Sequence, residues 1–128
     1  MNQRSRYKKK TNVTVVAVRL NLDTEGFTYR KWGAMQTCKP GDWLVENRGD
    51  TYTVDDESFK QTYREVSPGV YLKHAEIWAE IADHDGVVRT KEGETHYKSG
   101  DYLVTNPNDP DDRYAVVKHV FEEHYEPM

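Results

Sequence analysis

The chain reads Lys39-Pro40-Gly41-Asp42-Trp43-Leu44-Val45-Glu46-Asn47, and 59 residues later it reads Lys98-Ser99-Gly100-Asp101-Tyr102-Leu103-Val104-Thr105-Asn106. The likeness continues downstream at an offset of 62 residues, where Tyr52-Thr53-Val54 matches Tyr114-Ala115-Val116 and Phe59-x-x-x-Tyr63 matches Phe121-x-x-x-Tyr125. The change of offset means that three residues were added to the second copy's loop, which is 107–113 where the first copy has 48–51. The sequence therefore predicts an internal duplication.

Each copy of the repeated segment contains a predicted turn. Lys39-Pro40-Gly41-Asp42 has the form of a type II turn, because proline presets the dihedral angle at the second position and glycine accepts the positive φ of the third. Gly100 is placed to serve the same purpose in the second copy. The apolar residues that follow both turns predict a strand in each copy.

Short apolar and β-branched runs between turn residues predict a mostly β chain. Residues 13–20 form one predicted strand, and the alternation of 27–32 predicts a second strand that pairs with it in a hairpin. Asp55 or Asp56 is the predicted start of a short helix over 56–63, because aspartate accepts hydrogen bonds from the free N–H groups of a first helical turn. The other predicted strands are 43–45, 51–54, 70–73, 77–81, 87–91, 102–104 and 114–117, and a second helix is predicted at 119–125.

The length and composition indicate one folded domain. A unit of about 60 residues buries too little surface to be stable alone, so the two copies are expected to share a core within the 128-residue chain. The mean hydropathy of -0.95 is low, but aromatic residues make up 12% of the chain, which argues against disorder. No apolar run approaches the roughly 20 residues of a membrane span, and no apolar signal region follows the basic start, so we expect a cytoplasmic protein with no membrane partner.

Charge is distributed unevenly along the chain. Residues 1–11 hold five basic residues and no acid, whereas the remainder holds 13 basic and 22 acidic residues. An acidic body repels the phosphate backbone, which argues against nucleic acid as a partner. We expect residues 1–12 to form a basic, disordered tail.

These observations together predict an α+β, mostly β fold. Two related β-rich units, each closed by one short helix, are expected to pack as one compact domain with approximate internal two-fold symmetry. The first repeat unit is predicted at 13–66, the link at 67–75 and the second repeat unit at 76–128.

Residues that differ between the copies are the predicted ligand-binding residues, because residues that repeat are explained by the fold. Trp32 and Tyr29 align with Glu92 and Arg89, and an unpaired tryptophan can stack on a ring or a partner side chain. We expect a non-catalytic module that binds a protein or a small molecule in a groove between the units, as a monomer or a homodimer. The predicted ligand-binding residues are Tyr29, Trp32, Arg48, Arg89 and His96.

Two alternative functions stay open at this point. A small hydrolase or nucleotide-processing enzyme would use Asp42, Asp101 and His96 as its catalytic groups, although each aspartate follows a turn glycine and is expected to cap nearby N–H groups instead. A sequestering inhibitor of a host factor or a signalling nucleotide would require Arg48, Arg89 and Arg113 to converge.

Metal and cofactor chemistry finds little support in the sequence. None of the five histidines has the spacing of a zinc signature, and the single cysteine, Cys38, excludes an internal disulfide and supplies no metal-binding pair. The chain has no phosphate-binding glycine loop and no nucleophile elbow. We expect no metal and no cofactor.

The repeated motif resembles a known family. Pro40-Gly41-Asp42-Trp43-Leu44-Val45 with Tyr52-x-Val54 and Phe59-x-x-x-Tyr63, and the second set ending Phe121-Glu122-Glu123-His124-Tyr125-Glu126-Pro127, are similar to PGDYG-type bacterial and phage domains of unknown function. The resemblance covers most of 13–128 as two tandem copies, with Arg64 where the family pattern has the glutamate that the second copy keeps as Glu126. It implies an intracellular bacterial or phage accessory protein and no assigned activity.

Overall fold

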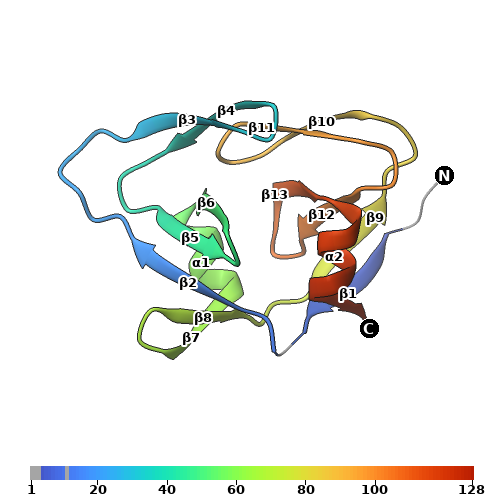
Figure 1. The fold of residues 1–128 in the computed structure, drawn as a ribbon, viewed down its shortest axis with the longest axis horizontal. Coiled ribbons are helices and arrows are strands. Elements are labelled where there is room, and N and C mark those ends of the chain that lie inside the picture. Colours follow the sequence, from blue (N-terminus) through green and yellow to red (C-terminus); the bar gives the residue numbers. More distant parts are fainter. Residues whose placement is uncertain (1–3, 11) are drawn as a thin grey trace.

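The computed structural model describes residues 4–10 and 12–128, and this part of the chain is mostly β. Two five-stranded antiparallel sheets form the body, and each carries one short helix (Figure 1). No helix within the described ranges is long and apolar enough to cross a bilayer. The first sheet has the order β6 (Asp50–Val54), β5 (Trp43–Asn47), β2 (Thr14–Arg19), β8 (Val70–Lys73) and β7 (Tyr63–Ser67). The second has the order β13 (Asp109–Val116), β12 (Tyr102–Asn106), β9 (Ile77–Ile81), β1 (Ser5–Lys9) and β14 (Tyr125–Pro127).

Two hairpins lie along one side of both sheets (Figure 1). They are β3 (Phe27–Lys31) with β4 (Ala34–Cys38), and β10 (Gly86–Arg89) with β11 (Glu94–Tyr97). The hairpins hold each other through backbone bonds, because the His96 N–H donates to the Trp32 carbonyl at 2.9 Å and the Thr37 N–H donates to the Glu92 carbonyl. Their tips are thereby fixed above the space between the sheets.

The predicted hairpin between 13–20 and 27–32 is wrong, because β3 pairs with β4 and not with β2. Strand β4 was missed because its buried residues are Gln36 and Cys38, and a buried glutamine breaks the apolar alternation that marks a strand. Gln36 lies between the hairpins, where its Nε2 donates to the Lys31 and Glu94 carbonyls at 2.9 and 2.6 Å, while its buried Oε1 has no hydrogen-bond partner among the described residues.

The prediction that 1–12 is a disordered tail is also wrong for its described part. Strand β1 pairs with β9 on one side and with β14 on the other. The basic composition concealed an alternating pattern in which Tyr7 and Lys9 face inward. The Tyr7 ring packs edge-on against Phe121, with ring centres 4.9 Å apart, so this strand belongs to the core of the second sheet. Residues 1–3 and 11 lie outside the described residues.

The two Gly-Asp corners have matching backbone settings. The φ angles of Gly41 and Gly100 are 88° and 96°, and the Asp42 and Asp101 N–H groups donate back to the Lys39 and Lys98 carbonyls at 3.1 and 3.0 Å. These are the predicted turns. The side chain of each aspartate also accepts a hydrogen bond from the N–H that opens its own turn, at 2.8 Å for Asp42 and 3.0 Å for Asp101.

The helices follow the predicted positions closely. Helix α1 (Asp56–Thr62) begins at Asp55, whose side chain accepts a hydrogen bond from the Ser58 N–H, and helix α2 is Lys118–His124. The repeated aromatic residues pack in two separate apolar cores, one on each sheet, and not in the single shared core that the length of the chain predicts. Phe59 stacks on Trp43 with ring centres 4.1 Å apart, and Phe121 stacks on Tyr102 at 4.0 Å.

Candidate functional site

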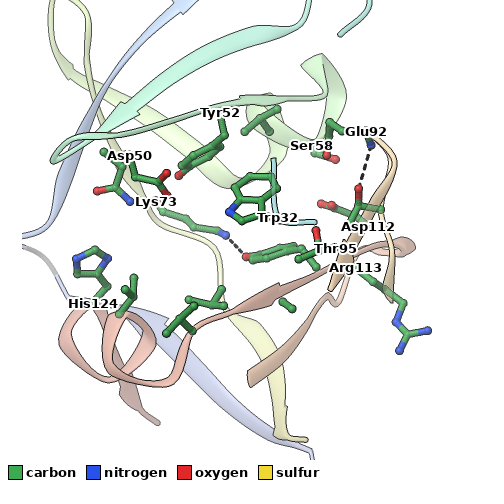
Figure 2. Close-up of a pocket in the computed structure, with 18 of the residues that line it drawn as sticks. Trp32, Asp50, Tyr52, Ser58, Lys73, Glu92, Thr95, Asp112, Arg113 and His124 are labelled. Carbon is green, nitrogen blue, oxygen red and sulfur yellow. Dashed lines mark hydrogen bonds between the residues drawn. The ribbon is translucent and has the colours of Figure 1, made fainter. Parts of the chain in front are cut away.

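A cavity of about 220 Å³ lies between the two sheets, beneath the hairpin tips (Figure 2). Both sheets, both helices and both hairpins contribute side chains to its wall. A cavity of roughly 150 Å³ suffices to bind benzene, so this one has room for a substituted ring. The polar and aromatic side chains in its wall include Lys9, Lys73, Tyr63, Tyr114, Tyr125, His124, Trp32, Glu92 and Asp112.

Two lysines place their ammonium groups at one end of the cavity. Lys9 comes from β1 and Lys73 from β8, and only 5% and 7% of these residues are exposed. Each Nζ lies within 6.0 Å of the ring centres of both Tyr63 and Tyr125. The two side chains therefore converge on the same pair of rings from opposite sheets.

Neither lysine has a carboxylate partner among residues 4–10 and 12–128. Lys73 Nζ donates to the Tyr114 hydroxyl, a contact drawn in Figure 2, and lies 4.8 Å from that ring's centre. Burial lowers the pKa of Lys9 from its usual 10.5 to about 7, and the positive charges of Lys73 and Arg48 add to this effect. Burial also lowers the pKa of His124, and the positive charges of Lys9 and Arg48 add to this effect. This end of the cavity is therefore rich in basic side chains, although Asp50, which is paired with Lys31, lies on the same side of Trp32 as Lys73 in Figure 2.

Tyrosine hydroxyls line the same region and stay protonated. Burial raises the pKa of Tyr63, Tyr114 and Tyr125 above the usual value for a phenol, because the charged form is poorly solvated there. A protonated hydroxyl is both a donor and an acceptor. The lysine end therefore offers hydrogen-bond donors in addition to positive charge.

The opposite end of the cavity is acidic, and Trp32 lies between the two ends in Figure 2. Glu92, at the tip of the β10–β11 hairpin, accepts a hydrogen bond from the Asp55 N–H at 3.0 Å. Burial raises the pKa of Glu92 to about 7 against the effect of that bond, and the nearby Asp112 raises it further. This end therefore holds two carboxyl groups, with Arg113 of β13 beside them in Figure 2.

Glu92→Gln is expected to stabilise the protein only at higher pH. Because the folded pKa is raised, Glu92 supplies its full share of stability below about pH 4.5, and this share is lost as the pH rises through about 7. Glutamine keeps the acceptor for Asp55. The free energy of unfolding should equal that of the wild type at pH 4 and exceed it by about 1–3 kcal/mol at pH 8, measured by urea denaturation. The control Glu94→Gln, at an exposed position on the same hairpin, should show no such change. If the difference in free energy of unfolding between Glu92→Gln and the wild type were the same at both pH values, it would contradict the burial of a charged Glu92 carboxylate.

Trp32 and Arg48 share an uncommon backbone conformation. Their φ angles are 56° and 53°, and each is the first residue of a two-residue loop followed by a glycine with positive φ. A tryptophan in this region is an outlier, since asparagine and glycine are the residues that such hairpin loops favour. Trp32 lines the cavity and contacts Tyr52, with ring centres 5.7 Å apart. Strain of this kind clusters at functional sites.

The five predicted ligand-binding residues occupy different places. Trp32 and His96 line the cavity, and Arg48 lies in the β5–β6 loop, whose flanking residues Asn47 and Asp50 line it. The Tyr29 hydroxyl accepts a hydrogen bond from the Thr53 N–H and so joins β3 to β6. Arg89 lines a separate hollow between the hairpins.

Of the residues of the alternative enzyme, Asp101 and His96 line the cavity and Asp42 does not. The carboxylates of Asp42 and Asp101 bind their own turns, and Asp101 also accepts a hydrogen bond from the Lys118 N–H at 3.3 Å. Of the three arginines, Arg113 lines the cavity but Arg89 lines the other hollow. No group of three potential metal ligands occurs within the described ranges.

Sequence reasoning missed Lys9 and Lys73, which hold the most unusual position in the structure. A signal was present, because Tyr7-Lys8-Lys9 and Tyr71-Leu72-Lys73 share a Tyr-x-Lys pattern. Both tyrosines contact the central phenylalanine of a core edge-on, Tyr7 with Phe121 and Tyr71 with Phe59 at 5.0 Å. The pattern went unnoticed because the first copy lay in the segment interpreted as a disordered tail.

Comparison with known proteins returned no match among family models, curated proteins or solved structures. The resemblance to PGDYG-type domains stays a prediction.

Proposed function

We propose that the chain is a non-catalytic binding module that holds a small organic ligand in the cavity between its two sheets. One observation carries the proposal: two buried lysines and a tryptophan in a strained turn meet at one cavity of about 220 Å³. Buried unpaired charge and a bulky residue with positive φ both reduce stability. Sequences retain such costly features where they serve a ligand.

The wall chemistry supports a ligand with a flat apolar body. Trp32, Tyr52 and Tyr114 present aromatic surface in the middle of a wall that also carries many polar side chains. Aromatic surface combined with polar groups that can orient a ligand is found at small-molecule sites. The small size of the cavity and its position between the sheets favour a small molecule over a protein as the ligand.

A panel of small ring compounds tests this function. Phenol, benzyl alcohol, benzamide and benzoate would be titrated into the full chain, with binding followed by calorimetry. At least one is expected to bind with a stoichiometry of one. The absence of binding by all four would remove the proposed function.

Trp32→Asn is expected to weaken ligand binding while leaving the stability of the protein nearly unchanged. Asparagine adopts the positive φ with less strain, a gain of about 1 kcal/mol, while the lost contact with Tyr52 costs a similar amount. The free energy of unfolding should therefore stay within about 1 kcal/mol of the wild type, whereas affinity for the binding probe should fall roughly tenfold or more. Met35→Asn, exposed on the same hairpin, is the matched control and should leave affinity unchanged. Equal affinity in the Trp32 variant would show that this residue is not part of the site.

We also propose that the molecule is one unit used twice, with approximate internal two-fold symmetry and an exchange of first strands. The units would be β1 to β7 and β8 to β14, each with one helix, so that β1 completes the sheet of the second unit and β8 that of the first. The equivalent register of Lys9 opposite Tyr125 and Lys73 opposite Tyr63 supports this arrangement. The two lysines would then be a symmetric pair. A bacterial or phage origin and a cytoplasmic location stay predictions.

A further inference from the structure

Burying two like charges in one cavity is costly without an anion. An isolated ammonium pays several kcal/mol on leaving water, and buried charges in proteins are normally paired. Lys9 and Lys73 face the same two tyrosine rings, and the described chain offers no carboxylate to either. The hydroxyl that accepts from Lys73 belongs to Tyr114, which supplies a dipole and no charge.

We propose that the Lys9 and Lys73 ammonium groups, with the surrounding tyrosine hydroxyls, bind the carboxylate of a small aromatic acid held in the central cavity. This inference rests on the proposed function and names its ligand class. One carboxylate has two oxygens and about four acceptor sites, so it can accept from both lysines and from Tyr114 at once. Charge-assisted bonds of this kind are the strongest hydrogen bonds available to the site.

The far end of the cavity restricts the ligand to a single acidic group. Glu92 and Asp112 line that end, and Figure 2 places them across Trp32 from Lys73. A second carboxylate on the ligand would meet the Asp112 carboxylate there, and the Glu92 carboxylate as well once Glu92 ionises above about pH 7, although Arg113 lines the same end. The ring between the two ends would lie against Trp32 and Tyr114. A monoanion with an uncharged far edge therefore fits better than a dicarboxylate or a nucleotide.

Binding should weaken as the pH rises. The groups that face Lys9 are Lys73 of β8, Arg48 of the β5–β6 loop, His124 of α2, Tyr63 of β7 and Tyr125 of β14. None of them is an acid, so the free protein holds Lys9 charged only below about pH 7. An anion that requires the charged amine must bring a proton with it above that pH. Its affinity should fall by up to about tenfold per pH unit over that range.

The test compares benzoate with benzamide, its uncharged analogue of the same shape, in calorimetric titrations of the full chain at pH 6 and pH 9. Acetate, inorganic phosphate and terephthalate are added as further probes. Benzoate is expected to bind more tightly than benzamide at pH 6 and to lose affinity at pH 9. Lys9→Met and Lys73→Met should each weaken benzoate binding roughly 10- to 100-fold, and Lys60→Met, a surface substitution with the same charge loss, should have no effect.

The possible outcomes distinguish a failure of the carboxylate site from a failure of the proposed function. Equal binding of benzoate and benzamide would overturn the carboxylate site but leave the cavity as a ligand site. Phosphate or terephthalate binding more tightly than benzoate would overturn the assigned ligand class. Benzoate affinity that survives both lysine substitutions would overturn the assigned residues. Retained folding of each variant is checked by circular dichroism, and Lys9→Arg, which keeps the charge, should retain more affinity than Lys9→Met.

Discussion

Lys9→Met is expected to raise the free energy of unfolding by about 1–4 kcal/mol at pH 6 in the ligand-free protein. Methionine fills a similar volume with no charge to desolvate. The wild type loses stability at that pH because the folded pKa of Lys9 is lowered to about 7 while the unfolded chain keeps the usual 10.5. The contribution of Lys9 is therefore fully present above about pH 10.5 and is lost as the pH falls through about 7.

The pH dependence of this gain is the decisive part of the prediction. The gain should be largest below pH 7 and should shrink toward zero as the pH approaches 10.5, where lysine is neutral in both states. Urea denaturation between pH 6 and pH 10 measures it directly. Lys60→Met on the exposed face of α1 should stay within about 0.5 kcal/mol of the wild type throughout. A destabilised Lys9→Met at pH 6 would mean that the folded chain itself satisfies this charge.

Tyr7→Ala is expected to lower the free energy of unfolding by about 2–4 kcal/mol. The Tyr7 ring contacts Phe121 and Tyr102 edge-on in the core of the second sheet, with ring centres 4.9 and 6.0 Å apart. Tyr71 makes the corresponding contacts with Phe59 and Trp43 at 5.0 and 5.4 Å. Removing either ring leaves a cavity beside a stacked pair that cannot collapse fully.

Tyr71→Ala should therefore lower the free energy of unfolding by about as much as Tyr7→Ala. Equal losses would show that β1 is part of the folded core and not a disordered tail. Ser5→Ala, exposed on the same strand, is the control and should have little effect. Thermal denaturation of the three variants at one pH provides the comparison. If Tyr7→Ala behaved like Ser5→Ala, strand β1 would not be part of the stable core.

The sequence was sufficient to predict the corners and the helices and to mark the repeated aromatics, because these depend on local chemistry or on repetition. Gly41 and Gly100 mark turns that need positive φ, and Asp55 caps a helix through its own side chain. The repeated aromatics pack in each core for the reason that made them recognisable, since the same contact was needed twice.

The site was harder to predict because it depends on long-range pairing. Trp32 was identified as unrepeated, yet its place at the cavity follows from a hairpin whose second strand is hidden by the buried Gln36. Lys9 pairs with Tyr125 in the register of β1 and β14. These two residues lie at opposite ends of the sequence, and no local sequence pattern reveals that they pair. A lysine in a basic segment also gives no sign of burial, because lysine is almost always exposed unless it is paired. Under the proposed duplication Lys9 and Lys73 would be equivalent residues, and the predicted division between repeated scaffold residues and unrepeated site residues would then hold only in part.

The most direct measurement is the pKa of Lys9 by NMR of selectively labelled lysine side chains, with and without saturating benzoate. An anion site at the two lysines requires a Lys9 that titrates near pH 7 in the free protein and at a clearly higher pH when the carboxylate is bound. The Lys73 signal should move on binding in the same titration. A Lys9 that titrates near the usual 10.5 without ligand, or one whose midpoint benzoate leaves unchanged, would contradict an anion site between these lysines.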